Sequence, residues 1–383
     1  MKYFIIAGEQ SGDLHGSNLV KELLAEDKNA EILCWGGDLM EATGAKLLMH
    51  YKATAFMGVT AVLKNLSKIS HNLSLCKQQI ADYKPDLIIL IDYPGFNLRI
   101  AEFAKKSGFK VFYYISPKFW AWNERRVRKI KMYIDKMYII FPFEVEFYSK
   151  HNISVEYRGN PLVDETQKRI LSLPGKEEII KSLELGNKPV IGLLAGSRKH
   201  EVEANLPQMI KVIRYLPEFQ FVLAGVKNLP DELYLKIIGN EPVILIKEKT
   251  YEILHVADAA LVASGTATLE TALFDTPQVV SYRDDFLTMI LAWLFVKVKY
   301  ISLVNLIMNE EVVKEVLGYL VNKKNLLREL KAVIPGGSKR AKMLSDYRIL
   351  KEKLGPAGAS GRIARDMVKE MRERMGKREK VLN

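Results

Sequence analysis

One acidic residue stands directly after a wholly apolar run. The run Leu87–Ile91 ends at Asp92, within the segment IDYPGFN. A carboxylate at the carboxyl end of a buried strand is partly desolvated, which raises its basicity and suits it to general-base catalysis. We predict that Asp92 is a catalytic base, with a turn or capping role as the alternative. Asn97, five residues later, is suited to cap the helix that follows.

Small and polar residues also follow the first apolar run, in the segment GEQSGDLHG at residues 8–16. Small residues allow a ligand to approach the backbone at the carboxyl end of a strand, where open α/β sheets bind ligands. The glycine spacing differs from the dinucleotide-binding fingerprint. A tight turn with Asp13 as a helix cap is the alternative. The residues that we predict to line a ligand site or cleft here are Gly8, Glu9, Ser11, Gly12 and Asp13.

Two tryptophans precede a strongly basic stretch in the segment SPKFWAWNERRVRKIK at residues 116–131. Trp120 and Trp122, in a loop after a strand, are unusual if they serve packing alone. We predict that they line an apolar or acyl-binding surface of the same cleft. Aromatic residues beside basic ones are also typical of nucleic-acid binding and of an interfacial membrane patch. A solvated basic helix is the remaining alternative.

The second half of the chain contains two turns that suit a nucleotide diphosphate. In AGSRKHEV, residues 195–202, a strand ends and a helix begins, so backbone N–H groups and the Arg198 side chain would bind a pyrophosphate. In SGTATLE, residues 264–270, the same design recurs, and the Glu270 carboxylate is placed to accept two ribose hydroxyls. Each turn alone is weak evidence, but together they predict a nucleotide site.

The residue types give no sign of a metal or a redox cofactor. Cys34 and Cys76 are the two cysteines, no CxxC pair exists, and the six histidines are scattered. Clustered carboxylates and a DxD motif are also missing from the sequence. We therefore expect no cofactor and no metal, with helix dipoles in the place of a metal ion. Cys34 is expected to be a small buried hydrophobic residue.

Apolar runs alternate with amphipathic helix patterns along the chain, which predicts parallel sheets covered by helices. A break near residues 159–161 separates two such series. The fold expected is α/β, with two Rossmann-like doubly wound domains at residues 1–160 and 161–343. A helical tail at 344–383 is expected to pack back on the first domain or to be solvated. The expected strands are Tyr3–Ala7, Glu31–Trp35, Leu87–Ile91, Val111–Ile115, Met137–Ile140, Val190–Leu194, Phe219–Ala224, Pro242–Ile246, Ala259–Val262 and Gln278–Ser281.

The charge of the chain favours a negatively charged partner. The formal net charge is +12 and the sequence pI is about 9.3, which suits nucleic acid, an anionic membrane or phosphorylated substrates. The first residues lack a signal-peptide pattern. The stretch 286–296 is strongly apolar but shorter than the ~20 residues that a bilayer requires. We expect a cytoplasmic protein, with 286–296 as an amphipathic helix at a lipid surface or a buried helix.

Taken in order, several segments resemble the motifs of lipid-A-disaccharide synthases. They are GEQSGDLHG, IDYPGFN, SPKFWAWNERRVRKI, PFE, AGSRKHEV, SGTATLE and YISLVNL, and the match runs from the first strand to about Asn305. The resemblance implies a GT-B fold, with an acceptor-binding first domain and a UDP-sugar-binding second domain that face a central cleft. It assigns the essential carboxylate to Asp92. It assigns contacts with the nucleotide to Ser197, Arg198, Glu201, Glu270 and Asn305.

The sequence departs from the family pattern at three positions. Asn160 stands where family members often have His, Gly95 where they often have Asp, and Gln10 where a hydroxyl residue is usual. The roles that the family gives to the first two positions therefore do not carry over to this chain.

The resemblance also implies a reaction and partners. UDP-2,3-diacylglucosamine would donate its sugar, with inversion, to the 6-hydroxyl of 2,3-diacylglucosamine 1-phosphate (lipid X). The products would be the β-1,6-linked lipid A disaccharide 1-phosphate and UDP. The protein would be peripheral on the anionic inner face of the inner membrane, and a homodimer is left open. The alternatives are a UDP-N-acetylglucosamine 2-epimerase, a muropeptide-lipid transferase, or a basic RNA-binding protein. The sequence lacks RRM, KH and zinc-knuckle signatures, so no nucleic-acid partner is expected.

Overall fold

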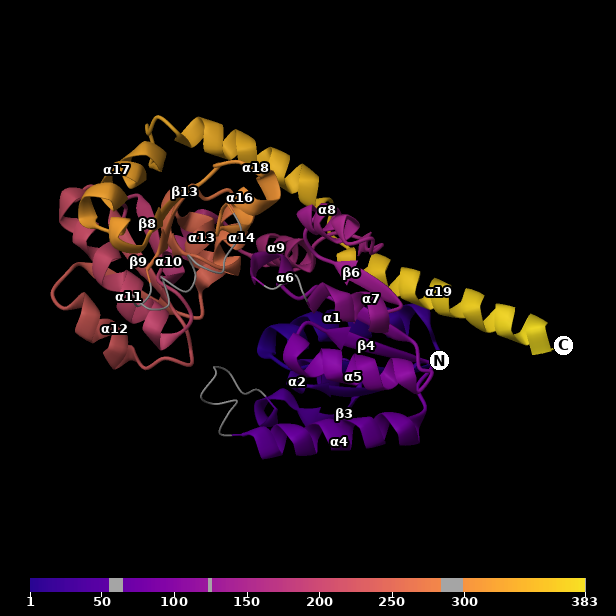
Figure 1. Cartoon of the computed structure of the whole chain (residues 1–383). Helices are drawn as coiled ribbons and strands as arrows, with labels where there is room; N and C mark the ends of the chain where they lie inside the picture. Colours follow the sequence, from indigo (N-terminus) through magenta and orange to yellow (C-terminus); the bar gives the residue numbers. More distant parts are fainter. Residues whose placement is uncertain (55–64, 123–125, 284–298, 383) are drawn as a thin grey trace. The chain divides into compact units, whose positions relative to one another are not determined.

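The computed structural model in Figure 1 describes residues 1–54, 65–122, 126–283 and 299–382. The chain divides into two compact units, one formed by Met1–Pro161 with Ala357–Asn383 and the other by Leu162–Pro356. The stretch 286–296, expected to be an amphipathic or buried helix, lies outside the described residues. Among the described helices, none is both long enough and apolar enough to cross a membrane.

The first unit is built on a seven-stranded parallel sheet in the order β3-β2-β1-β4-β5-β6-β7. The strands are β1 (Lys2–Ala7), β2 (Glu31–Gly36), β3 (Lys46–His50), β4 (Leu87–Ile91), β5 (Val111–Tyr114), β6 (Lys136–Ile139) and β7 (Glu156–Tyr157). The helices are α1 (Gln10–Glu26), α2 (Asp38–Ala42), α4 (Leu66–Tyr83), α5 (Pro94–Lys106), α6 (Phe119–Trp122), α7 (Val127–Tyr133), α8 (Phe143–Lys150) and α19 (Ala359–Leu382), with the 3-10 turn η1 (Tyr51–Ala53).

Helices cover both faces of this sheet because successive side chains of a strand point to opposite faces. Tyr3 and Ile5 of β1 belong to one buried core, which includes side chains of α1 and α19. Phe4 and Ile6 belong to a second core, which includes side chains of α4 and α5. The helix α19 thus returns the end of the chain to the first unit, where it packs against α1 (Figure 1).

The second unit repeats the design with a six-stranded parallel sheet in the order β10-β9-β8-β11-β12-β13. The strands are β8 (Val190–Leu194), β9 (Gln220–Gly225), β10 (Val243–Lys247), β11 (Ala259–Ala263), β12 (Gln278–Tyr282) and β13 (Lys314–Leu317). The helices are α9 (Pro161–Ser172), α10 (Lys176–Ser182), α11 (Lys199–Met209), α12 (Asp231–Ile238), α13 (Thr250–Val256), α14 (Thr266–Leu273), α16 (Leu303–Met308), α17 (Lys323–Val333) and α18 (Arg340–Leu354), with the 3-10 turns η3 (Ile210–Tyr215) and η4 (Gly318–Leu320).

The expected fold, two doubly wound α/β domains with a C-terminal helix, is confirmed. Each expected strand is present within about one residue of its expected bounds. The strands β3, β7 and β13, which lie at sheet edges, were not predicted from the sequence. An edge strand has one neighbour and keeps partly exposed side chains, so it needs no continuous apolar run.

The tail expected at 344–383 begins inside α18. Tyr347 and Leu350 of this helix are fully buried, and the Tyr347 hydroxyl lies 3.2 Å from the Gln278 amide nitrogen in the second unit. Gly355, with a φ of 77°, ends α18 in a conformation that favours glycine. The chain therefore passes from the second unit to the first after Pro356. Of the two helices in the expected tail, α18 belongs to the second unit and α19 to the first.

Candidate active site

The carboxyl ends of β1 and β4 lie side by side, at the point where the strand order of the first unit reverses. Open α/β sheets bind ligands outside such a point. The Tyr93 ring lies against Gly8 so closely that a Cβ added to Gly8 would come within 2.2 Å of it. The Tyr93 hydroxyl donates a hydrogen bond to the Thr54 carbonyl at 2.8 Å. Folding therefore brings the segments GEQSGD and IDYPGFN together.

Asp92 and Tyr93 form a corner in the chain directly after β4. Asp92 lies half-buried on this corner, in a strained backbone conformation. Asp92 has a φ of 44° and Tyr93 a φ of 46°, which are uncommon values for residues with side chains. Burial raises the pKa of Asp92 to about 6, the Glu9 carboxylate adds to this rise, and Lys118 opposes it. A carboxylate with that pKa takes up a proton readily near neutral pH, as a general base must.

The residues of the first loop separate into exposed groups and groups that shape the loop. Ser11 is exposed and Glu9 is half-buried at the N-cap of α1. A Cβ on Gly12 would meet the Ala7 side chain at 3.2 Å, a tight approach that favours glycine at this position. Asp13 is 3% exposed. Its carboxylate accepts hydrogen bonds from the backbone N–H groups of Gly37, Leu39 and Met40 at 2.8, 3.1 and 3.1 Å.

Asp13 therefore ties the first loop to the turn after β2 and to the start of α2. Its carboxylate binds the first N–H groups of α2, a helix more than twenty residues later, whereas the sequence predicted a cleft residue with a local helix cap as the alternative. All three donors are backbone groups, so the Asp13 carboxylate holds the loop in shape in this structure.

Trp120 is anchored by a buried carboxylate that the sequence did not single out. The indole Nε1 donates a hydrogen bond to Glu144 Oε1 at 3.2 Å, and the Trp120 ring meets Phe143 edge-on at 5.0 Å. Glu144 is 1% exposed, and burial raises its pKa to about 7 although the backbone N–H groups of Phe141 and Ile140 stabilise the charged form. The only sign in the sequence was the PFE motif. Trp122 ends α6, and its side chain lies outside the described part of the structure.

In the second unit, the turn after β8 already holds a carboxylate. The Glu201 side chain accepts hydrogen bonds from the Ser197 and Arg198 backbone N–H groups at 2.9 and 3.2 Å, and Arg198 Nη1 lies 2.8 Å from Glu201 Oε1. Burial opposes the charge on Glu201, but these donors outweigh it and lower the pKa of its carboxyl. Gly196, with a φ of 117°, leaves room for the Glu201 side chain.

This arrangement shows that the turn can hold an anionic group. It also shows that Glu201 occupies the backbone donors that we expected to meet a pyrophosphate. The Arg198 side chain is 58% exposed, so its guanidinium has further N–H donors directed to solvent.

Glu270 lies one turn into the neighbouring helix, α14, after β11. The order of the sheet reverses between β8 and β11, so the two turns flank the same point. Glu270 Oε1 accepts a hydrogen bond from the Tyr251 hydroxyl at 2.7 Å, and Tyr251 stacks on Phe274 with ring centroids 5.4 Å apart. Burial raises the pKa of Glu270, and its bond with Tyr251 opposes the rise. The contact with ribose hydroxyls stays a prediction.

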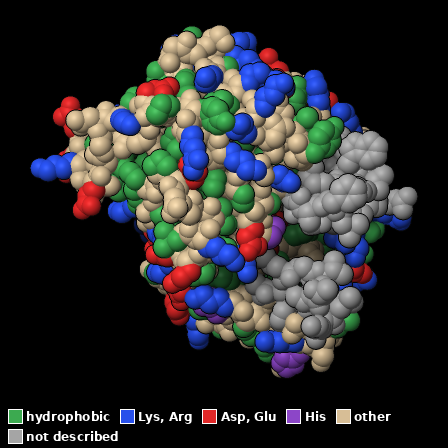
Figure 2. All heavy atoms as spheres, turned by 90° about the vertical axis from the view of Figure 1, so that its left-hand side faces the viewer, with side chains coloured by type: hydrophobic (Ala, Val, Ile, Leu, Met, Phe, Trp, Pro, Cys, Tyr) green, Lys and Arg blue, Asp and Glu red, His purple; other side chains and the backbone are tan. Residues whose placement is uncertain are grey.

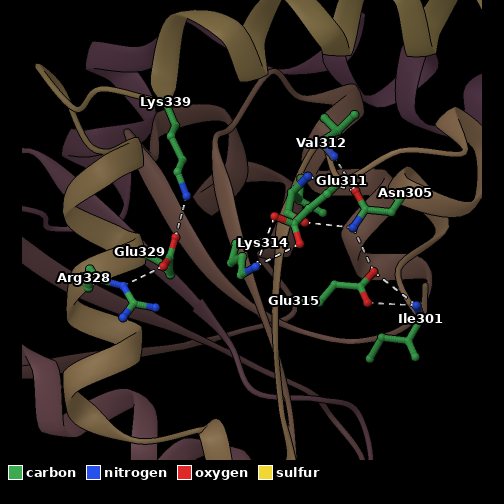
Figure 3. A network of polar contacts seen from close by, with 10 residues as sticks. Ile301, Asn305, Glu311, Val312, Lys314, Glu315, Arg328, Glu329 and Lys339 are labelled. Carbon is green, nitrogen blue, oxygen red and sulfur yellow. Dashed lines mark hydrogen bonds and ion pairs between the residues drawn. The ribbon is translucent and has the colours of Figure 1, made fainter. Parts of the chain in front are cut away.

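Asn305 is completely buried, and both ends of its side-chain amide form hydrogen bonds with residues of the second unit (Figure 3). Its Nδ2 donates to the Val313 carbonyl at 2.8 Å and to Glu315 Oε1 at 2.9 Å. Its Oδ1 accepts from the Val312 and Val313 backbone N–H groups, both at 2.9 Å. Glu315 in turn accepts from the Ile301 and Ser302 backbone N–H groups.

The Ile301 carbonyl accepts a hydrogen bond from the Ser264 hydroxyl at 3.4 Å, in the turn after β11. The Asn305 network therefore fixes the backbone of residues 301–302 beside the predicted nucleotide turn. In this structure Asn305 supports the backbone of the predicted site through hydrogen bonds. The carboxylate of Glu315, which the sequence did not single out, contributes to the same support.

Two cavities among the described residues of the second unit lie at the amino-terminal edge of its sheet. One of about 620 Å³ is lined in part by Lys188, Val190 and Asp258, where β8 and β11 begin. Another of about 450 Å³ is lined in part by Gln220 and Val243, where β9 and β10 begin. Neither contains a predicted site residue. Within the described ranges, no group of three or more His, Cys, Asp or Glu side chains is placed to hold a metal ion.

Comparisons with known proteins agree with one another. Residues 3–362 match the model of the family described as Lipid-A-disaccharide synthetase. The chain is 38% identical to Lipid-A-disaccharide synthase 1 of Legionella pneumophila (strain Lens) over 97% of both chains. It is 37% identical to Lipid-A-disaccharide synthase of Syntrophus aciditrophicus over 94% of this chain and 95% of the relative. A third similar protein, from Geobacter metallireducens, has the same name and is 35% identical over 95% of both chains.

Solved structures share the fold at low sequence identity. A UDP-GlcNAc 2-epimerase from Neisseria meningitidis bound to UDP-GlcNAc has a TM-score of 0.69 at 13% identity, and the match covers 96% of this chain and 100% of that one. A glycosyltransferase from Rickettsia africae has a TM-score of 0.61 at 14% identity, with 97% and 98% covered. These likenesses establish the architecture alone.

Proposed function

The chain belongs to the lipid-A-disaccharide synthetase family, and on that premise we propose how its residues carry out the family's glycosyl transfer. The donor is UDP-2,3-diacylglucosamine, and the acceptor is 2,3-diacylglucosamine 1-phosphate. The acceptor's 6-hydroxyl attacks the anomeric carbon of the donor, and the bond from that carbon to UDP breaks. The products are the β-1,6-linked disaccharide 1-phosphate and UDP.

Asp92 is the base of this reaction, and its environment is the observation that carries the proposal. It lies on a strained corner at the carboxyl edge of the first sheet, and burial raises its pKa to about 6. Its carboxylate takes the proton of the attacking 6-hydroxyl, so that the oxygen can form the new bond as the UDP leaves. Attack from the side opposite to UDP inverts the anomeric centre, as in other inverting glycosyl transfers.

The first unit takes the acceptor. Glu9 and Ser11 are the partly or fully exposed side chains of the loop after β1, and the Glu9 carboxylate acts on Asp92, while Gly8, Gly12 and Asp13 keep this loop in shape. Trp120, held by Glu144, offers an apolar ring face to an acyl chain. We place Trp122 on the same surface by its position in the sequence alone.

The second unit takes the UDP of the donor. Arg198 is its main electrostatic contact, because negative charge builds up on the pyrophosphate as it leaves. Ser197 and Glu201 shape the turn that carries Arg198, and Asn305 shapes the neighbouring loop. Glu270 accepts the ribose hydroxyls through the oxygen that Tyr251 leaves available.

Both lipid substrates reside in a membrane, so the protein must reach one. We propose a peripheral attachment to the anionic cytoplasmic face of the inner membrane. The net charge of +12 supports it, and Lys and Arg side chains predominate over Asp and Glu on the upper part of the face drawn in Figure 2. Each basic residue near such a surface contributes ~1 kcal/mol, so the attachment should weaken with salt.

The decisive experiment is turnover of the purified protein with both diacylated substrates. We expect UDP release and a disaccharide 1-phosphate only when donor and acceptor are both present. UDP-N-acetylglucosamine alone is the control, because a 2-epimerase would convert it to its 2-epimer. Epimerisation of that control without disaccharide formation would contradict the proposal.

A further inference from the structure

The Asn97 amide lies at the meeting point of β1 and β4, beneath Asp92. Asn97 is 0% exposed in the first turn of α5, whose N-cap residue is Tyr93, so Asn97 does not cap this helix. Its Nδ2 donates to the Asp92 carbonyl at 2.8 Å and to the Ile91 carbonyl at 3.2 Å. The Ile6 carbonyl on β1 lies 3.5 Å from the same nitrogen. Three carbonyls around one atom require a donor there, which fixes the orientation of the amide.

The other end of the amide has no such partner. Among the described residues, none forms a hydrogen bond with Asn97 Oδ1, although this atom is buried. A buried acceptor without a donor is unfavourable. An apolar residue of similar size would avoid that cost, so the Asn97 side chain is explained by its donor end, which bonds to the carbonyls of Ile91 and Asp92.

A second buried donor reaches the same carbonyl from β5. The Tyr113 hydroxyl donates to the Asp92 carbonyl, and Tyr113 is 0% exposed. Burial raises the pKa of Tyr113 well above its ordinary value, so the hydroxyl keeps its proton and stays a donor. The Asp92 N–H donates to the Tyr114 carbonyl at 3.1 Å. Both backbone polar groups of Asp92 are therefore held by their neighbours.

This support explains how the strained corner persists. Asp92 and Tyr93 both have positive φ values, a conformation that an unsupported backbone would leave. Rotation of the Asp92 peptide groups would break the hydrogen bonds from Asn97 and Tyr113. The side chain leaves the backbone at the same Cα, so fixing the two peptide groups also fixes the direction of the Cα–Cβ bond that carries the carboxylate.

We propose that Asn97 and Tyr113 are positioning residues that hold the Asp92 carboxylate toward the acceptor hydroxyl. They touch no reacting atom and act through the Asp92 carbonyl. The inference rests on the proposed role of Asp92 as the base. A misplacement of about 1 Å at a reacting group can reduce a rate by ~10²-fold, so the effect on turnover should be large.

The test compares Tyr113→Phe and Asn97→Ala with a matched control, Tyr3→Phe. Tyr3, at the start of β1, is also a fully buried strand tyrosine of the first unit. Its hydroxyl donates a hydrogen bond to the Asp27 carboxylate at 3.0 Å. All three variants lose a buried hydrogen bond, but Tyr3→Phe leaves the Asp92 carbonyl untouched. Tyr113→Phe preserves the ring, so it remains informative if Asn97→Ala fails to fold.

We expect kcat to fall by ~10–100-fold in Asn97→Ala and by ~3–10-fold in Tyr113→Phe, with the KM for the UDP donor within about two-fold of the wild type. The control should keep the wild-type kcat per folded molecule. The double variant should lose less than the product of the two single losses, since both residues hold one carbonyl.

The pH profile gives a readout that a purely structural role would not change. The groups that influence Asp92 are Glu9, Lys118 and the Tyr93 backbone N–H, and burial is the largest influence on its pKa. A loosened corner admits water to the carboxylate, so the acid limb of kcat/KM should move to lower pH in Asn97→Ala and Tyr113→Phe. It should stay in place in Tyr3→Phe.

If Asn97→Ala and Tyr113→Phe keep the kcat and the acid limb of the Tyr3→Phe control, the two residues serve stability alone and the inference is wrong. That failure is separate from a failure of the proposed base. Full turnover of the Asp92→Asn variant would show that Asp92 is not the base, whatever the result for Asn97 and Tyr113.

Discussion

The Tyr93 ring packs directly on the backbone of Gly8, and a Cβ at Gly8 would approach the ring to 2.2 Å. This contact joins the loop after β1 to the corner that carries Asp92. Because Tyr93 follows Asp92 in the chain, a backbone shift that displaces the ring also moves the carboxylate. The requirement for glycine at position 8 is therefore steric, and it is set by a residue 85 positions later.

Gly8→Ala should reduce turnover by ~10-fold or more, because the new methyl group must push Tyr93 and Asp92 out of place. Overpacking of this kind typically costs about 1–3 kcal/mol of stability, which urea unfolding would measure. Gly95→Ala is the control from the same corner, since its Cβ would meet no atom within 4 Å. Equal activity of the two variants would contradict the role given to the contact.

Asp92→Asn should abolish most turnover while the fold and the UDP affinity stay intact. The substitution preserves shape but removes the base, and the loss of a general base typically costs ~10²–10⁴-fold in rate. Turnover and calorimetric UDP binding would be measured on the same preparation. Near-normal turnover would show that Asp92 only positions the acceptor.

The activity should fall as the pH drops below about 6. Burial raises the pKa of Asp92 to about 6, and the base must be deprotonated to accept the hydroxyl proton. The acid limb of kcat/KM in the wild type should therefore have a midpoint near that value. A midpoint near the ordinary carboxyl range of about 4 would exclude Asp92 as the titrating group.

The same shift predicts a change in stability. A folded-state pKa above the unfolded value adds stability that is fully present at low pH and is lost as the pH rises through about 6. Asp92→Asn has no such loss. Between pH 4 and pH 8, the urea midpoint of the variant should therefore rise relative to that of the wild type.

Arg198→Ala should weaken UDP binding by ~10-fold, because a charge-assisted contact contributes about 1.5–3 kcal/mol and this side chain is partly exposed. Glu201→Gln separates the two roles open to Glu201. If Glu201 only shapes the turn, removal of its negative charge should not raise the UDP dissociation constant. A large rise would instead indicate a direct contact between Glu201 and the nucleotide.

Asn305→Ala should destabilise the second unit by about 2–4 kcal/mol, because it leaves buried backbone groups of residues 312–313 without partners and removes one of the donors to the Glu315 carboxylate. UDP binding should weaken at the same time as residues 301–302 lose their support. Asn240→Ala, at an exposed position, is the control. Weaker UDP binding with unchanged stability would instead favour a direct contact between Asn305 and the nucleotide.

The sequence by itself determined where the two candidate sites lie along the chain. Central strands of a parallel sheet are buried on both faces, so Leu87–Ile91 and Val190–Leu194 appear as unbroken apolar runs. Ligand-binding loops follow the carboxyl ends of such strands, which made Asp92 and Arg198 visible as candidates. The edge strands β3 and β13 escaped notice because their partly exposed residues need no apolar run.

Only the tertiary structure decided which polar side chains remain available to a ligand. Asp13 bonds to the turn after β2, Glu201 to its own turn, and Asn305 to residues 312–315. Asn97, suited by its position to cap a helix, instead supports the Asp92 carbonyl. A buried polar group must find a hydrogen-bond partner, and that partner is supplied by whichever segment folding brings beside it. Residue type and spacing identify the polar group, but three-dimensional packing determines its partner.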